Sequence, residues 1–310
     1  MVKQFRFGVQ VGGSFTPESF VKTAQRAEEL GYATIYTPDH FIDTELAPMV
    51  AMAMAAAATS TLRVGALVFD NDYKHPAILA KEVASIDVLS GGRTELGIGA
   101  GWMKVDYTAL GLPYDRPGVR IERLEEGLAV IKGCFGAEAF SFRGDHYTIT
   151  DYNAIPKPTQ ATVPILIGGG GPRVLRLAGR EADIVGINPN MKAGAVSLDA
   201  VSDSLAEMID TKVGWIKEGA GDRFDDLELQ IRYFLAAVTD DRTAFAAAIA
   251  PGFGVSAEEA LDAGLTLVGS VDEVCDLMEL RRERWGVSYA VIGGDEMEMF
   301  APVVERLAGK

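Results

Sequence analysis

Residues 59–102 read TSTLRVGALVFDNDYKHPAILAKEVASIDVLSGGRTELGIGAGW, and this stretch determines the fold that we predict. It begins with an almost continuously apolar run, residues 62–69, which is typical of a strand buried on both faces of a parallel sheet. Apolar residues at helical spacing follow, and Gly91 and Gly92 are placed to end that helix. A second strand, residues 94–100, completes a β-α-β unit.

The same alternation of strands and helices continues along the chain. Eight segments have the pattern of strands, each followed by a helical pattern: residues 5–11, 33–37, 62–68, 94–100, 163–167, 183–187, 227–235 and 289–292. Eight such units predict an α/β fold, a closed (β/α)8 or TIM barrel, as a single domain spanning residues 1–310. Three longer segments are predicted as insertions after strands 4, 6 and 7: residues 103–162, 188–226 and 240–286.

Several helices carry clear terminal signals. Thr16 is placed to cap the first helix, Pro17 suits its first turn, and Gly31 follows its end, while His75 precedes the third helix as a cap. The second helix, residues 49–58, reads MVAMAMAAAA and is apolar nearly all round. Such a helix is expected to be covered on both sides, so we predict a homodimer in which a second copy covers its outer face.

The composition excludes some partners. Of the 310 residues, 48% are hydrophobic, and the formal net charge is -15. This charge repels nucleic acid and anionic membranes, so we expect neither as a partner. The first residues lead into a strand without a secretory stretch, which favours a cytoplasmic location. The three histidines, His40, His75 and His146, lack metal-ligand spacing, so we expect no metal site.

Polar residues follow the second predicted strand, in the sequence IYTPDHF. Asp39 and His40 would therefore lie at the carboxyl end of a barrel strand, where barrel enzymes carry their catalytic groups. An imidazole transfers protons near neutral pH. Pro38 and Asp39 are also ordinary turn residues, so a structural role for the segment stays open at this point.

Glycines recur where a ligand would need to approach the backbone. Gly97, Gly99 and Gly101 alternate along one strand, so one of its faces has no side chains, and a flat ligand is a candidate for the space above it.

A second glycine segment follows strand five, where residues 168–171 lead through Pro172 into a helix. Backbone amides of such a loop, together with the positive end of the helix, favour a phosphate. The segment matches neither the GxGxxG pattern of dinucleotide-binding folds nor a Walker loop. The alternative is a flexible turn without a ligand.

These segments together resemble the luciferase-like monooxygenase superfamily, particularly its branch of oxidoreductases that use the 5-deazaflavin coenzyme F420. The resemblance covers nearly the whole chain. It is carried by TPDHF at residues 37–41, GALVFDNDYKHP at 65–76, IDVLSGGRTELGIGAGW at 86–102 and VPILIGGGGPRVLRLAGREADIVG at 163–186.

The resemblance implies roles for the matching residues. His40 would donate or accept a proton at the reactive edge of the cofactor, and Asp39 would act beside it as a catalytic residue and cofactor contact. Leu67–Val68 matches a non-prolyl cis peptide that lies against the ring in family members. The full set of implied cofactor-binding residues is Asp39, Leu67, Val68, Gly99, Gly101, Gly169, Gly170 and Gly171.

The substrate pocket is expected to include Phe41, Asn71 and Trp102. Sugar-phosphate dehydrogenases of the same branch carry a glutamate at the position of Trp102 and a tryptophan at the position of Thr44. Both are absent here, so we do not expect glucose 6-phosphate as the substrate.

The resemblance implies hydride transfer between F420 and a small organic substrate. The alternatives are an FMN-dependent monooxygenase that uses reduced flavin and O2, and a non-catalytic flavin-binding protein.

Arg173, Arg176 and Arg180 fall on one face of the helix after the glycine loop. They form either a solvated stripe or, as a further hypothesis, a site for the polyglutamate tail of F420.

Overall fold

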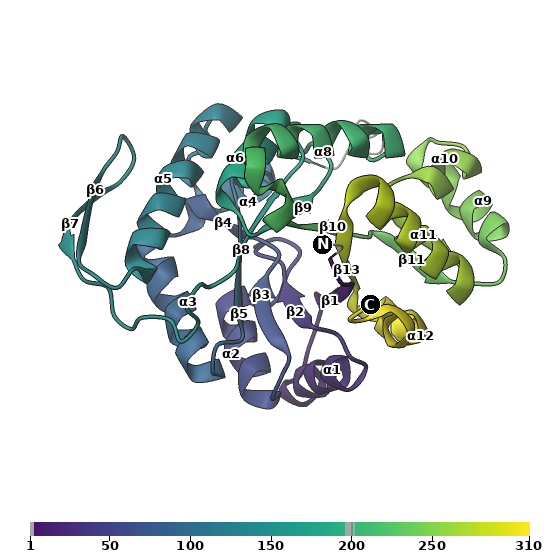
Figure 1. Cartoon of the computed structure of the whole chain (residues 1–310), viewed down its shortest axis with the longest axis horizontal. Helices are drawn as coiled ribbons and strands as arrows, with labels where there is room; N and C mark the ends of the chain where they lie inside the picture. Colours follow the sequence, from purple (N-terminus) through teal and green to yellow (C-terminus); the bar gives the residue numbers. More distant parts are fainter. Residues whose placement is uncertain (1–2, 196–199, 201) are drawn as a thin grey trace.

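The computed structural model describes residues 3–195, 200 and 202–310. Eight strands form a closed barrel in which all neighbouring strands are parallel, in the order β1-β2-β3-β5-β8-β9-β10-β13 and back to β1 (Figure 1). The barrel strands are β1 (Arg6–Gln10), β2 (Thr34–Thr37), β3 (Arg63–Ala66), β5 (Thr94–Gly99), β8 (Ile165–Gly169), β9 (Ile184–Ile187), β10 (Glu228–Arg232) and β13 (Val287–Gly293).

Each barrel strand is followed by a helix that packs outside the barrel, so the predicted (β/α)8 fold is confirmed. These helices are α1 (Pro17–Glu29), α2 (Pro48–Ala58), α3 (Pro76–Ser90), α5 (Pro117–Phe135), α6 (Pro172–Glu181), α8 (Ala206–Ala220), α11 (Val271–Trp285) and α12 (Met297–Leu307). In the described part of the chain, no helix has the length and apolar character needed to cross a membrane.

The helix signals read from the sequence are borne out. The hydroxyl of Thr16 accepts a hydrogen bond from the amide of Ser19 at 3.2 Å and caps α1. His75 caps α3, since its Nδ1 accepts from the amide of Ala77 at 3.2 Å. Gly91 ends α3 with a φ of 70°, in the left-handed region that glycine adopts without steric cost.

The third barrel strand is interrupted in the segment predicted as residues 62–68. Strand β3 ends at Ala66, the peptide bond between Leu67 and Val68 is cis, and β4 (Phe69–Asp70) resumes pairing with β5. The non-prolyl cis bond thus lies at the expected position, at the carboxyl end of the strand. A 3-10 turn, η1 (Asn71–Tyr73), follows.

The prediction for the seventh strand, residues 227–235, is wrong about where the strand ends. Strand β10 stops at Arg232, and β11 (Leu235–Val238) pairs with β12 (Thr266–Gly269) in a separate two-stranded sheet. The amide of Phe234 donates to the carbonyl of Leu265 at 3.1 Å, which turns the chain away from the barrel. Because the sequence stays apolar through this turn, periodicity could not show where the strand ends.

The hairpin of the first insertion and helices α9 (Arg242–Phe253) and α10 (Ala257–Asp262) of the third lie at opposite edges of the molecule (Figure 1). The first contains α4 (Lys104–Leu110) and, beyond α5, the predicted hairpin of β6 (Phe140–Arg143) and β7 (Thr148–Tyr152). The second insertion contains α8 and η2 (Gly221–Asp226). Part of the segment before α8 lies outside the described residues. The third contains α9, α10 and β12, and η3 (Gly294–Glu296) precedes α12.

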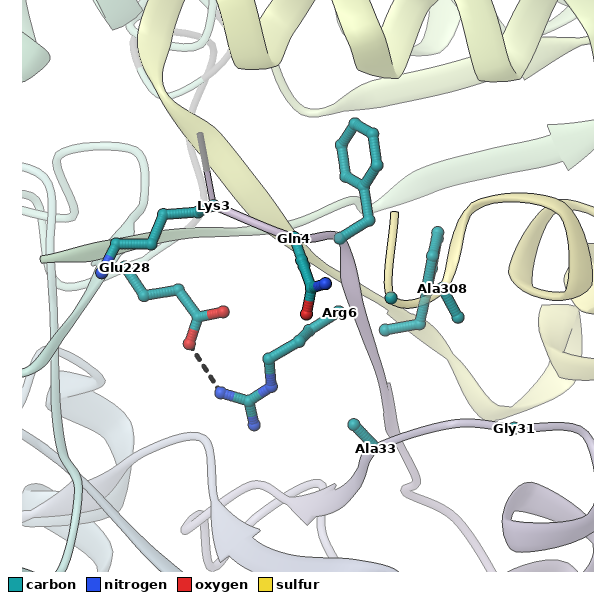
Figure 2. A pocket seen from close by; sticks show the side chains of 10 residues that line it. Lys3, Gln4, Arg6, Gly31, Ala33, Glu228 and Ala308 are labelled. Atoms are coloured by element: carbon teal, nitrogen blue, oxygen red, sulfur yellow. Dashed lines mark hydrogen bonds and ion pairs between the residues drawn. The ribbon is translucent and has the colours of Figure 1, made fainter. Parts of the chain in front are cut away.

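Charged residues close the amino-terminal end of the barrel (Figure 2). Arg6 forms an ion pair of 2.6 Å with Glu228 and a second ion pair with Glu95, which also pairs with Arg63 at 2.7 Å. Burial alone would raise the pKa of Glu95, but the two guanidinium groups hold it below its usual range. A cavity of about 360 Å³ adjoins this network, and its lining includes Arg6, Glu228 and Ala308. We assign this end to stability, since barrel enzymes carry their sites at the opposite end.

One side of α2 is uncovered in a single copy of the chain. Ala51 and Ala55 are buried against the barrel, whereas Val50 is 67% exposed and Ala53 and Ala57 are also exposed. A groove of about 520 Å³ runs between α2 and α3, with Ala53 among its lining residues. The predicted homodimer would cover this side and stays a prediction.

Candidate functional site

His40 and the buried carboxylate of Asp106 form the centre of the site. His40 follows β2 at the carboxyl end of the barrel, and its Nδ1 lies 2.8 Å from Oδ2 of Asp106. The side chain of Asp106 is fully buried, whereas that of His40 is 20% exposed. Because Nδ1 is engaged by the carboxylate, the other ring nitrogen, Nε2, is the one that can exchange a proton with a ligand.

Asp106 also organises the backbone around His40. Its Oδ1 accepts hydrogen bonds from the amides of Phe41 and Ile42, each at 3.1 Å. Tyr73 donates to Oδ2 at 3.4 Å. One carboxylate therefore holds both the His40 ring and the backbone of the segment after β2.

Sequence reasoning did not identify Asp106. The residue lies on the short helix α4, inside a segment that the sequence predicts only as an insertion. A signal was present in the sequence. Trp102 follows the glycine-rich strand, and Asp106 lies only four residues after Trp102. Its role depends on closure of the barrel, which brings the segments after β2 and β5 together.

Asp39 makes its hydrogen bond to β4 rather than to this pair. Its Oδ2 accepts a hydrogen bond of 3.1 Å from the amide of Asp70. Burial raises the pKa of Asp39, and this hydrogen bond opposes the rise in part. Asp39 is therefore a candidate cofactor contact, while the partner of the His40 ring is Asp106.

A second buried carboxylate, Asp70, lies beside Gly101. The hydroxyl of Tyr107 donates to Oδ2 of Asp70 at 2.7 Å, and the amide of Asp72 donates to Oδ1 at 2.9 Å. Burial raises the pKa of Asp70 to about 7, despite these two bonds. A Cβ atom on Gly101 would lie 2.0 Å from the Tyr107 hydroxyl, so the chain itself already explains the glycine at this position.

The cis peptide lies across the top of the barrel interior. The carbonyl of Leu67 accepts a hydrogen bond of 2.9 Å from the amide group of Gln10. The side chain of Val68 covers Gly99 and Gly168, whose Cβ positions would lie 3.0 and 3.3 Å from its methyl groups. The chain's own Val68 therefore occupies the face of β5 that we expected a flat ligand to occupy, and such a ligand would lie above Val68.

The glycine loop after β8 forms a cradle of backbone amides. Gly169 ends β8, Gly171 precedes α6 in an extended conformation, and α6 has no side-chain cap. Among the described residues, the amides of Gly170, Gly171 and Arg173 donate to no acceptor. Uncapped amides at the start of a helix favour an anion, so these residues fit the predicted phosphate site.

The loop after β9 forms the other side of the cradle. A Cβ atom on Gly170 would lie 2.3 Å from the carbonyl of Pro189, so only glycine fits there. The position at Gly171 is open, with Nδ2 of Asn190 3.6 Å from its Cβ position. Buried Lys212 holds this loop by donating to the carbonyl of Asn188 at 2.8 Å.

The arginines of α6 are paired with glutamates. Ion pairs join Arg173 to Glu122 at 3.0 Å, Arg176 to Glu218 at 2.7 Å and Arg180 to Glu125 at 2.5 Å. The three arginine side chains are about half exposed and already have carboxylate partners. This arrangement supports the solvated-stripe interpretation over the polyglutamate-tail hypothesis.

Two of the three expected substrate residues lie at the opening. The rings of Trp102 and His40 meet edge to face, with centroids 5.4 Å apart, and Phe41 is 51% exposed. Asn71 lies elsewhere, at 2% exposure, with Nδ2 3.3 Å from the Tyr147 hydroxyl. It is held beneath α5 because the turn η1 directs its side chain toward Gly127, whose Cβ position lies 2.3 Å from Oδ1 of Asn71.

The arrangement as a whole fits a flat ring that carries a phosphate. Val68, packed over Gly99 and Gly168, forms the floor of the barrel mouth, and the free amides after β8 provide an anion site at its edge. In the described part of the chain, no cluster of His, Cys, Asp and Glu is placed to hold a metal ion.

Comparison with known proteins agrees with this geometry. The family of luciferase-like monooxygenases matches residues 1–253. An F420-dependent glucose-6-phosphate dehydrogenase from Amycolatopsis mediterranei is 33% identical over 176 residues, which are 54% of this chain and 53% of that protein. An FMNH(2)-dependent dimethylsulfone monooxygenase from Pseudomonas putida is 33% identical over 179 residues, 56% of this chain and 49% of that protein. The matches thus span about half the length of these relatives.

Solved structures show the same fold over nearly the whole chain. The coenzyme F420-dependent tetrahydromethanopterin reductase from Methanopyrus kandleri superposes with a TM-score of 0.78 at 20% identity, over 98% of this chain and 100% of that one. An F420-dependent secondary alcohol dehydrogenase gives a TM-score of 0.77 at 17% identity, over 98% and 99% of the two chains. With the family match covering most of the sequence, the chain belongs to the luciferase-like monooxygenase family.

Proposed function

We propose that this protein is an oxidoreductase that transfers a hydride between coenzyme F420 and a small organic substrate. The observation that carries the proposal is the pair of His40 and buried Asp106, placed at the same end of the barrel as a cradle of free amides. Such a pair supplies a proton relay in the place where barrel enzymes carry their chemistry. The F420-dependent and FMN-dependent relatives support a deazaflavin or flavin as the cofactor.

The cofactor would be held by backbone groups. The amides of Gly170 and Gly171 would bind its phosphate, together with the positive end of α6. The Leu67–Val68 segment would support the ring from below, and Asp39 would contact its edge. When bound, F420 supplies the hydride chemistry at C5 of its ring, and the protein supplies orientation and electrostatics.

His40 would manage the proton that accompanies the hydride. The carboxylate of Asp106 accepts from Nδ1, which leaves Nε2 free to accept the proton of a hydroxyl substrate or return it in the reverse direction. Trp102, edge-on to the His40 ring, would restrict the ring's motion and shield it from water.

The substrate would lie between Phe41 and Trp102 and would be small and partly apolar. The glutamate and tryptophan expected for a glucose-6-phosphate dehydrogenase are replaced by Trp102 and Thr44. We therefore propose a substrate other than the sugar phosphate that names the Amycolatopsis relative.

Titration of the purified protein with F420 and with FMN tests the proposal, with ring fluorescence as the signal. We expect preferential binding of F420, and we expect His40→Ala to abolish turnover while the Kd for F420 stays within about twofold. Preferential binding of reduced FMN with oxygen consumption would favour the monooxygenase alternative. Binding without turnover against a panel of alcohols and carbonyl compounds would favour the non-catalytic protein.

A further inference from the structure

Arg232 lies in the top layer of the barrel interior. It is the last residue of β10, two residues after Gln230, whose Oε1 lies 3.0 Å from the Cβ position of Gly186 on the neighbouring strand. Residues two apart on a strand point to the same face, so both side chains point into the barrel. The guanidinium crosses Gly293 of β13, and Nη2 lies 3.0 Å from the Cβ position of that glycine.

Arg232 reaches across the mouth toward the cis peptide. Its Nε donates to Oε1 of Gln10 at 2.9 Å, and Gln10 donates in turn to the carbonyl of Leu67 at 2.9 Å. Nη1 donates to the carbonyl of Tyr233. The guanidinium lies over the exposed ring of Phe234, with its central carbon 5.2 Å from the ring centroid.

The guanidinium has no carboxylate partner within the part of the chain that is described. No ion pair joins Arg232 to an acidic residue within 4.0 Å, and Nη2 donates to no described group. Glu296 is a nearby carboxylate, and its Oε2 lies 2.2 Å from the same Cβ position of Gly293. Burial lowers the pKa of Arg232 to about 10, which still leaves it charged at neutral pH.

Arg93 shows the contrast with a structural arginine. Its guanidinium donates to the carbonyls of Ala56, Thr59, Leu62 and Ser90, so every nitrogen has an acceptor. A partly buried cation with a free nitrogen is costly unless an anion completes it. The position of Arg232 at a barrel mouth, rather than between helices, gives such an anion access.

The mouth is therefore electrically polarised. Asp39, Asp70 and Asp106 lie on the side of β2, β4 and α4, whereas Arg232 lies on β10, which is four strands away from β3 around the barrel, and Glu296 is the carboxylate on its side. In a chain with a net charge of -15, this cation is a specific feature of the site. An anionic substrate would be turned with its charge toward Arg232 and its opposite end toward His40.

We propose that Arg232, with Gln10, binds the carboxylate of an organic acid, so that the substrate of this enzyme is a carboxylate-bearing molecule. The inference rests on the proposed function, because it takes the barrel mouth to be the substrate site. An anionic group of the cofactor ring is the other source of the same chemistry, and the test separates the two. Arg232 is thus assigned as the residue that determines substrate specificity.

The test uses the full-length protein and small carboxylates as probes, benzoate and acetate, with benzamide and acetamide as neutral counterparts. Thermal unfolding is measured without cofactor, and quenching of F420 fluorescence is measured with it. We expect benzoate, but not benzamide, to raise the Tm of the wild type. Arg232→Gln should weaken the response to benzoate at least tenfold, and Arg232→Lys should retain part of it, because lysine keeps the charge but not the planar fork.

The matched control is Arg26→Gln, which removes an exposed arginine that pairs with Glu298 on the outer surface. This variant should respond to benzoate like the wild type. Without ligand, the Tm of Arg232→Gln should equal or exceed that of the wild type, because a desolvated charge has been removed.

Equal responses to benzoate and benzamide, or an unchanged benzoate response in Arg232→Gln, would overturn the proposal. A Kd for F420 that rises tenfold in Arg232→Gln while the benzoate response persists would assign the anion to the cofactor and overturn the substrate assignment. Since the thermal measurement needs no cofactor, failure of F420 to bind would refute the proposed function without deciding the role of Arg232.

Discussion

The imidazole of His40 and the carboxylate of Asp106 are 2.8 Å apart, although 66 positions separate them in the chain. The same carboxylate accepts hydrogen bonds from the amides of Phe41 and Ile42. It therefore fixes the position of both the His40 ring and the loop that carries it. Asp106 is therefore a positioning residue for His40, and its contribution should be visible in turnover rather than in cofactor affinity.

Replacement of Asp106 by asparagine should impair turnover. The amide nitrogen of Asp106→Asn would donate toward Nδ1 and force the proton of the ring onto Nε2. We expect kcat to fall about 10- to 100-fold and its pH profile to shift, while the Kd for cofactor stays within about twofold. Steady-state kinetics across pH 5–9 and fluorescence titration measure these effects.

Asp43→Asn is the matched control, since Asp43 is exposed on the same loop. It should leave kcat and its pH profile unchanged. Wild-type kinetics in Asp106→Asn at every pH would contradict the positioning role.

The buried carboxyl of Asp70 should make stability depend on pH. Its pKa is raised from 3.8 to about 7 in the folded protein. A group with a raised folded pKa contributes stability below its unfolded pKa, and that contribution is lost as the pH rises through 7. The loss is at most about 4 kcal/mol, from roughly 3 pKa units at 1.36 kcal/mol each.

Asp70→Asn cannot ionise, so its Tm should rise relative to the wild type as the pH increases from 5 to 8. Thermal unfolding at several pH values measures this difference, with the exposed carboxylate variant Asp222→Asn as the control. A Tm difference that stays constant over this range would show that Asp70 does not titrate there.

The amide cradle should be selective for the phosphate of the cofactor. Gly171 has a φ of -94° and an open Cβ position, so the loop accepts a side chain there. Gly171→Asp would place a carboxylate against the free amides and should raise the Kd of FMN or F420 at least about tenfold, since charge-assisted hydrogen bonds contribute roughly 1.5–3 kcal/mol. Fluorescence titration measures the affinities.

Gly171→Ala controls for the added side chain and should change the Kd by no more than about twofold. Riboflavin, which lacks the phosphate, should bind the wild type and Gly171→Asp equally. An equal loss of affinity for riboflavin and FMN would show that the loop does not bind the phosphate.

The exposed side of α2 should mediate association of two copies. Charges introduced by Val50→Glu and Ala53→Glu would be desolvated in such an interface, so we expect the double variant to be monomeric and the wild type dimeric. Light scattering after size-exclusion chromatography measures the mass. Thr211→Glu, on the exposed side of α8, should leave the mass unchanged, and a monomeric wild type would refute the interface.

The features that sequence analysis predicted correctly depend on local patterns. The barrel strands follow from apolar runs between helix signals, and the caps at Thr16 and His75 follow from neighbouring residues. The cis bond at Leu67–Val68 was correctly implied by the family resemblance. The end of the seventh strand was wrong because Leu235 finds its partner in β12, some thirty positions further along.

The sequence by itself determined the parallel barrel, the position of His40 at a strand end and the glycine loop before α6, because hydrophobic periodicity and turn chemistry act over a few residues. Only the tertiary structure decided that Asp106 is the partner of His40, that Asn71 is buried under α5, and that Arg232 lies in the mouth without a carboxylate within ion-pair distance. These features depend on which distant side chains the closed barrel brings within hydrogen-bond distance and which it removes from water.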